Sequence, residues 1–174
     1  MTKTLEIMHG YKLFEQDMRT GKLYPLFIDS KNETPIGEWI HGECIPTKGF
    51  AVRQGWHVGT IPTAYWLTGK NGKYNSKRGK NFRRVWCEVL INDSFDYTDY
   101  DNNMKTDYQT ITNFDGYYHF RETANRPWII TSDIKVIRVL DEHQRQYILR
   151  QMDIDEHAII REHVMKKWKI DIDA

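Results

Sequence analysis

The sequence has few cysteines, no long apolar run and no targeting signal, and each of these absences excludes a class of protein. Only two cysteines, Cys44 and Cys87, occur in 174 residues, and they form no C-x-x-C pattern. Both are most simply buried thiols of a reducing compartment, and a disulfide between them is the lesser alternative. No apolar run approaches the roughly 18 residues of a membrane-spanning helix, and the N-terminus lacks a signal-peptide pattern. These absences predict a cytoplasmic protein with no membrane partner.

Net charge and the common catalytic signatures are also missing. The formal net charge is +1, so overall electrostatics favours neither nucleic acid nor an acidic partner. The chain contains no G-x-S-x-G, H-E-x-x-H, Walker or G-x-G-x-x-G motif. The length suits one domain with a sizeable core. The sequence therefore predicts a single domain whose activity, if any, follows none of these common patterns.

The segment from Thr34 to Thr68 is rich in residues that shape the backbone. It holds five of the eleven glycines, three of the five prolines and three of the six tryptophans. Glycine allows positive φ and close backbone approach, and proline fixes φ. We expect sharp bends here, with sheet edges meeting around large aromatic rings, and a short helix opened by Thr60-Ile61-Pro62 after the G-W-H turn.

The periodicity of the chain predicts an α+β fold with a twisted, mainly antiparallel sheet. An N-terminal hairpin is expected first, and apolar runs that are rich in β-branched and aromatic residues predict later strands. Asp141 and either Asp153 or Asp155 can cap two C-terminal helices that form a helical hairpin. The expected later strands are 37–44, 50–58 (one strand, or a pair around the Gln54-Gly55 turn), 84–92, 117–121 and 128–140. We divide the single domain into a body of residues 1–140, with an insertion at 93–126, and a helical appendage of residues 141–174.

A basic segment spans residues 70–84 and contains seven Lys or Arg but no acid. Cationic side chains bind phosphates, and aromatic rings stack on unpaired bases. One interpretation is a binding loop for RNA, DNA or an acidic partner, and the other is a solvated loop balanced by nearby acids. The candidate binding residues are Lys70, Lys73, Tyr74, Lys77, Arg78, Lys80, Phe82, Arg83 and Arg84.

An acidic run follows the basic segment. Its carboxylates can bind a divalent cation, but the run lacks the glycine and terminal glutamate of an EF-hand loop. Neutralisation of the basic loop and contact with a basic protein surface are the favoured alternatives, so no metal site is predicted. The acidic residues are Asp93, Asp96, Asp99, Asp101 and Asp107.

A second candidate site lies at the G-W-H turn. A histidine beside an arginine suits an anionic substrate and proton transfer, so His57 and Arg53 are candidate catalytic residues, with His41 and Glu88 nearby. The alternative is that His57 and Arg53 only hydrogen-bond to the backbone of a tight turn.

The segments G-Y-K-L-F (10–14), P-T-K-G-F-A-V-R-Q-G-W-H (46–57) and R-V-W-C-E-V (84–89) resemble an uncharacterised family of small phage and prophage proteins. The resemblance covers roughly residues 10 to 140, and the second segment is its most specific part. It implies a phage origin and brings no assigned activity. Small phage proteins of this size often inhibit host defence systems.

A weaker resemblance is to ADP-ribosyltransferase-like domains. It is carried by residues 10–14, 55–60, 64–67 and 85–89, and it implies a nucleotide-using enzyme with NAD as cosubstrate at His57 and Arg53. The sequence departs from that pattern at Lys12, and no glutamate occurs in 129–140.

We therefore predict a binding protein without a cofactor, encoded by a phage. Its partner is expected to be a host defence complex or another nucleic-acid-handling complex, contacted through the basic loop. An ADP-ribosyltransferase-like enzyme is the alternative.

Overall fold

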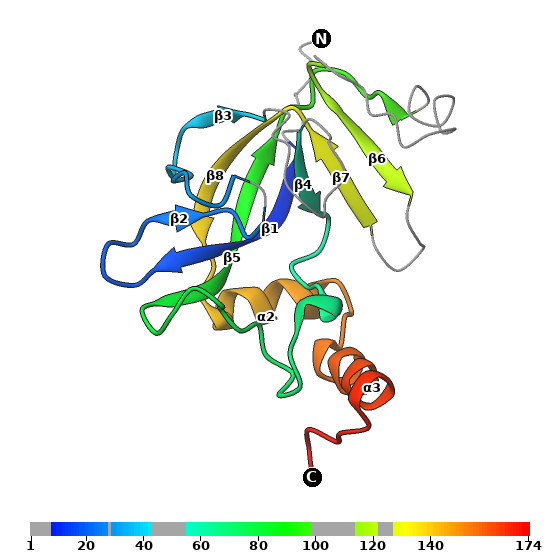
Figure 1. Cartoon of the computed structure of the whole chain (residues 1–174). Helices are drawn as coiled ribbons and strands as arrows, with labels where there is room; N and C mark the ends of the chain where they lie inside the picture. The colour runs from blue at the N-terminus through cyan, green and yellow to red at the C-terminus, as the bar shows by residue number, and fades with distance from the viewer. Residues whose placement is uncertain (1–7, 28, 43–54, 99–113, 122–126) are drawn as a thin grey trace.

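The computed structural model describes residues 8–27, 29–42, 55–98, 114–121 and 127–174. These residues form one mostly antiparallel, open sheet of eight strands with two α-helices, so the predicted α+β class is confirmed (Figure 1). The elements are β1 (His9–Asp17), β2 (Leu23–Tyr24), β3 (Trp39–His41), β4 (Trp56–Gly59), the 3-10 helix η1 (Tyr65–Leu67), β5 (Phe82–Ile91), β6 (Tyr117–Arg121), β7 (Pro127–Thr131), β8 (Asp133–Val139), α2 (Glu142–Gln151) and α3 (Glu156–Trp168).

The sheet curls because two consecutive strands belong to its two halves. The strand order is β3-β8-β5-β1-β4-β7-β6, and β2 pairs with β1 beside this path. Only Ser132 separates β7 from β8, so strands that lie far apart in the order meet at one corner (Figure 1). The prediction of one strand over 128–140 is wrong, because Ser132 leaves the ladder. Its N–H donates to the Gly116 carbonyl at 2.9 Å, and its hydroxyl accepts from the Gly116 N–H at 3.0 Å.

Both faces of the sheet carry apolar side chains. The central strands β1 and β5 pair along their length, with Leu13 opposite Trp86. Side chains alternate between the faces of a strand, so Phe14 and Cys87 join one core while Leu13 and Trp86 join another. The second core is covered by η1 and α2. Burial raises the pKa of the Cys87 thiol to about 12, which makes it an inert core residue, as predicted.

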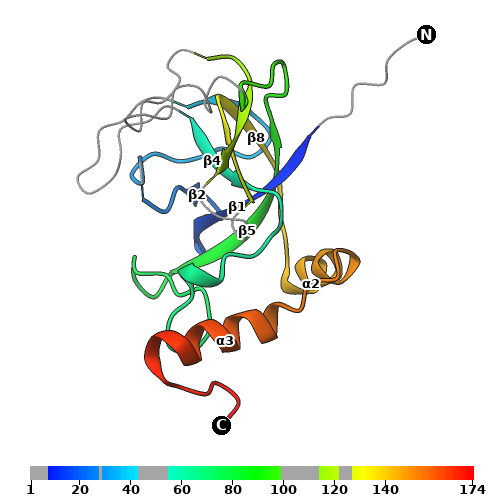
Figure 2. The same ribbon diagram turned by 90° about the vertical axis from the view of Figure 1, so that its right-hand side faces the viewer.

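The C-terminal helices begin where their capping residues predict. The Asp141 carboxylate accepts from the Gln144 N–H, and the Gln144 side chain accepts from the Asp141 N–H, which completes a capping box for α2. Asp155 caps α3 by accepting from the Ala158 N–H. Figures 1 and 2 show both helices below the sheet, with their axes at a steep angle to each other. The expected helix after the G-W-H turn is a single 3-10 turn, η1, that begins after Pro62.

Candidate functional site

The basic segment is fastened to the body by Arg84. Its guanidinium pairs with Glu15 at 3.0 Å, and the two side chains are only 7% and 2% exposed. The Ser76 hydroxyl donates to the second Glu15 oxygen at 2.6 Å. A buried carboxylate of β1 therefore holds the segment at two points.

Arg78 is a second internal anchor. It donates to the carbonyl oxygen of Ser30 at 2.7 Å and to that of Pro25, and its guanidinium lies 5.9 Å from the centre of the Phe82 ring. Arg78, predicted to bind a partner, is thus engaged with the loops around β2, and Phe82, also predicted to bind, packs against Arg78 and Tyr24 of β2.

Tyr74 is engaged with α3 and β5. Its hydroxyl donates to Glu156 at 3.1 Å, and its ring meets Trp86 edge to face at 5.7 Å. Burial, followed by the negative charge of Glu156, raises the pKa of Tyr74 to about 12. Four of the nine predicted binding residues, Tyr74, Arg78, Phe82 and Arg84, therefore have intramolecular roles.

The other five predicted binding residues are exposed cations. None of them forms an ion pair with an acid among the described residues. Of the acidic run, Asp96 accepts from the Thr98 N–H at 2.9 Å beside β6 and Asp93 is exposed, and among the described residues neither forms an ion pair with the loop. Asp99, Asp101 and Asp107 lie outside the described residues. The five exposed residues are Lys70, Lys73, Lys77, Lys80 and Arg83.

His57 lies on β4, and Lys12 of β1 bonds to the backbone of this strand. The Lys12 ammonium donates to the His57 carbonyl at 2.8 Å, and burial lowers the pKa of Lys12 to about 8. The His57 ring meets Trp128 edge to face at 6.2 Å. Arg53, its predicted catalytic partner, lies outside the described residues.

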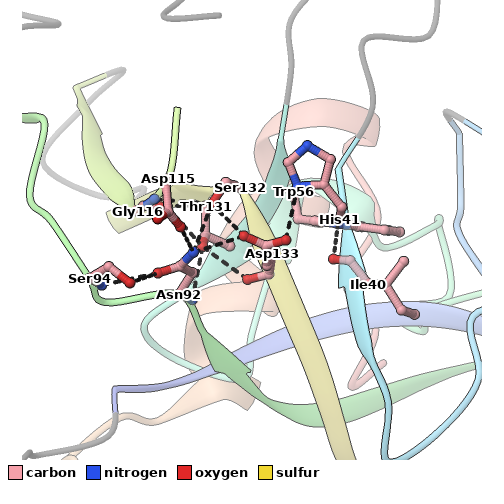
Figure 3. Close-up of polar contacts among 10 residues, drawn as sticks. All are labelled: Ile40, His41, Trp56, Asn92, Ser94, Asp115, Gly116, Thr131, Ser132 and Asp133. Atoms are coloured by element: carbon pink, nitrogen blue, oxygen red, sulfur yellow. Dashed lines mark hydrogen bonds and ion pairs between the residues drawn. The ribbon is translucent and has the colours of Figure 1, made fainter. Parts of the chain in front are cut away.

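The other two members of that predicted group each have a charged partner of their own. Glu88 pairs with His9 at 2.8 Å and with Arg138 at 2.9 Å on the outer surface of β5 and β8. His41 lies on the edge strand β3 and pairs with Asp133 at 2.9 Å (Figure 3). The sequence thus named His41 but not its carboxylate partner.

Asp133 is the centre of a polar network at the corner between β7 and β8 (Figure 3). One carboxylate oxygen contacts His41, and the other accepts from Ser132 at 2.7 Å and from Asn92 at 2.8 Å. Asn92 also donates to Asp115, which precedes β6. Burial raises the pKa of Asp133, but the hydrogen bonds from Asn92, Ser132 and His41 outweigh it, so the pKa is lowered overall.

The network can orient an imidazole on the surface. A carboxylate-held histidine is the arrangement used in proton transfer, and the His41 side chain is 58% exposed. The same bonds also fasten β3 to the corner, and Trp56 adds a hydrogen bond to the Ile40 carbonyl at 3.2 Å. A signal was present in the sequence, because the polar pair Ser132-Asp133 interrupts an apolar run.

Comparison with known proteins gives no family. No family model, curated protein or solved structure matches this chain. The resemblances to a phage family and to ADP-ribosyltransferase-like domains therefore remain predictions.

Two further searches covered only the described part of the chain. There, no cluster of three or more His, Cys, Asp or Glu is arranged to hold a metal ion. Likewise, neither α2 nor α3 has the length and apolar character that crossing a bilayer requires.

Proposed function

We propose that this protein is a phage-encoded accessory binding protein that docks on a nucleic-acid-handling complex of the host and inhibits a defence system. The observation that carries the proposal is the group of five exposed loop cations that have no ion-pair partner among the described residues. The phage origin rests on the sequence resemblance.

The anchors explain how such a loop can bind. Arg78 and Arg84 fasten it to the body, so less conformational freedom is lost when a partner binds. Lysine heads on a fastened loop meet phosphates as point charges, and each phosphate contact releases counterions. The loop therefore favours a polyanion over a neutral partner.

A charge-neutralising variant tests this function. The triple substitution Lys70→Gln, Lys77→Gln and Lys80→Gln should weaken binding of single-stranded oligonucleotides and of the captured host complex. The slope of log K against log salt should fall by about 2, since each lost phosphate contact removes ~0.7.

A matched control removes the same charge elsewhere. Lys22→Gln, Lys31→Gln and Lys169→Gln change exposed lysines outside the loop, so affinity should stay within about twofold of the wild type. Equal losses in the two triple variants would reduce the effect to net charge and remove the loop from the interface.

An ADP-ribosyltransferase-like enzyme that uses NAD at His57 and Arg53 is the second candidate. The observation in its favour is the contact of the His57 ring with Trp128, which borders an aromatic cavity. Incubation with labelled NAD and host extract tests it. Label transfer by the wild type that disappears in His57→Ala would show that the protein is the enzyme and not the binding protein. We expect no transfer.

A further inference from the structure

A cavity of about 730 Å³ lies between β4, η1, β5, β7 and α3. Figures 1 and 2 show α3 below the sheet, and η1 packs against this helix. The volume falls in the range of small-molecule sites. It belongs to neither the cationic loop nor the Asp133 network.

Aromatic side chains dominate the wall of this cavity. The Trp66 ring meets Tyr65 at 5.0 Å and Trp128 at 5.4 Å, in both cases edge to face, and Trp86 completes the group. Three of the six tryptophans of the chain therefore line a single hollow. Ring faces of this kind stack on planar ligands, and every nucleobase has such a face.

Trp86 contributes ring surface and not a donor to this wall. It is 6% exposed, and its indole N–H is buried without an acceptor among the described residues. Because the N–H is covered by protein atoms, the cavity offers a ligand only the part of the ring that lines it.

The α3 side of the cavity is cationic. Glu162 is already paired with Lys166 at 2.7 Å, so its charge is compensated. Lys167 also lines the cavity, and its ammonium lies 4.7 Å from the centre of the Trp168 ring. The remaining positive charge suits an anionic group on the ligand.

We propose that this cavity binds a nucleobase that carries a phosphate, with the base among the tryptophans and the phosphate near Lys167. This site adds to the proposed function and does not depend on the basic loop. The ligand can be a free nucleotide or one residue of a single strand, since both offer the same chemistry.

Binding is measured by calorimetry and by quenching of tryptophan fluorescence, with AMP, UMP, adenosine, ribose 5-phosphate and an eight-nucleotide single strand. AMP should bind, adenosine should bind several-fold more weakly, and ribose 5-phosphate should not bind. A strand that binds through the cavity should compete with AMP, whereas a site for free nucleotides leaves AMP binding unchanged when the strand is added.

Two variants separate the contributions. Trp128→Leu removes a stacking ring and should weaken AMP binding by ~10-fold or more. Lys167→Ala alters an exposed side chain, so it should change stability little, and it should cost several-fold in affinity with a weaker salt dependence.

Trp39→Ala is the control, because this tryptophan is 53% exposed on β3 and does not line the cavity. Failure of AMP and UMP to bind at millimolar concentration, or equal binding by wild type, Trp128→Leu and Lys167→Ala, overturns the site. The triple variant of the basic loop distinguishes a failure of the cavity site from a failure of the proposed function. If that variant loses oligonucleotide binding but keeps AMP binding, the cavity site is supported. If the wild type binds the oligonucleotide but not AMP, the cavity site is overturned and the proposed function is not.

Discussion

Two regions of the molecule hold charged networks of opposite character. At the helical end, Arg145 is 4% exposed and pairs with Glu156, which is 7% exposed. Its guanidinium also donates to Glu142 at 2.6 Å and to the Pro62 carbonyl at 3.0 Å. At the β7–β8 corner, Asp133 pairs with an exposed histidine and is itself partly solvated.

The difference lies in what remains when one partner is removed. Removing one member of a buried pair leaves a charge without water or counterion, whereas an exposed partner is simply hydrated. The helical end is therefore a stiff support for the basic loop and the aromatic cavity. The corner can lose a contact at little cost.

The largest effect is expected at Arg145. Arg145→Ala leaves Glu156 buried without its main cation, so the free energy of unfolding should fall by ~3–5 kcal/mol. Arg150→Ala on the same helix is the control, since Arg150 is exposed and should change stability by less than ~0.5 kcal/mol. Chemical denaturation gives the free energy of unfolding of both variants. Similar values would mean that the helical end is no more sensitive to the loss of a charged partner than an exposed site.

A smaller loss is expected at Arg84, which has an exposed neighbour for comparison. Arg84→Ala should cost ~2–4 kcal/mol because Glu15 keeps only its Ser76 donor, while Arg83→Ala should be nearly neutral. Adding Glu15→Gln to Arg84→Ala should recover part of the loss, because no buried charge then remains. Absence of recovery would show that Glu15 is not the source of the cost.

At the corner, Asp133→Ala should cost only ~1–2 kcal/mol through the loss of hydrogen bonds to Ser132, Asn92 and His41. Asp93→Ala changes the exposed aspartate that directly follows Asn92, serves as control and should be neutral. A loss as large as that of Arg145→Ala would mean that the corner is as tightly closed as the helical end.

The smallest effect is the pH dependence of the corner. The pKa of Asp133 is lowered on folding, so its contribution is present above the unfolded value of about 4 and is lost as pH falls through the lower folded value. The stability difference between wild type and Asp133→Asn should be constant above about pH 5 and shrink on acidification. A stability difference that grows at low pH would mean that folding raises the pKa of Asp133 and does not lower it.

Local patterns predicted much of the fold. The β5 strand, the β6 strand and both helix starts follow from apolar runs and capping residues, and the structure confirms them. The corner at Ser132 was missed, because a single polar residue hardly changes the periodicity of an apolar run. Ser132 leaves the ladder by bonding to Gly116, which is 16 positions away in the chain.

The candidate site was predicted less well, since burial decides which charges remain accessible. The sequence treated the seven cations of the basic loop alike, yet Arg78 and Arg84 bond within the molecule. Arg83 and Arg84 differ only in which face of β5 they occupy and in the presence of Glu15 opposite, and that pairing is set by the register of two distant strands. The aromatic cavity was not predicted, because its rings come from η1, β5 and β7.

The position of β1 in the sheet affects how the protein folds during its synthesis. The first strand of the chain ends up in the middle of the sheet, between β4 and β5, and its long pairing with β5 joins residues 9–17 to 82–90. During synthesis β1 can therefore pair only with the short strands β2 and β4 until β5 leaves the ribosome, and β5 in turn waits for β8. Distant pairing of this kind is slow to form. We expect the sheet to assemble late, close to the completion of synthesis, and an unfinished chain to expose the apolar faces of β1 to chaperones or to other chains.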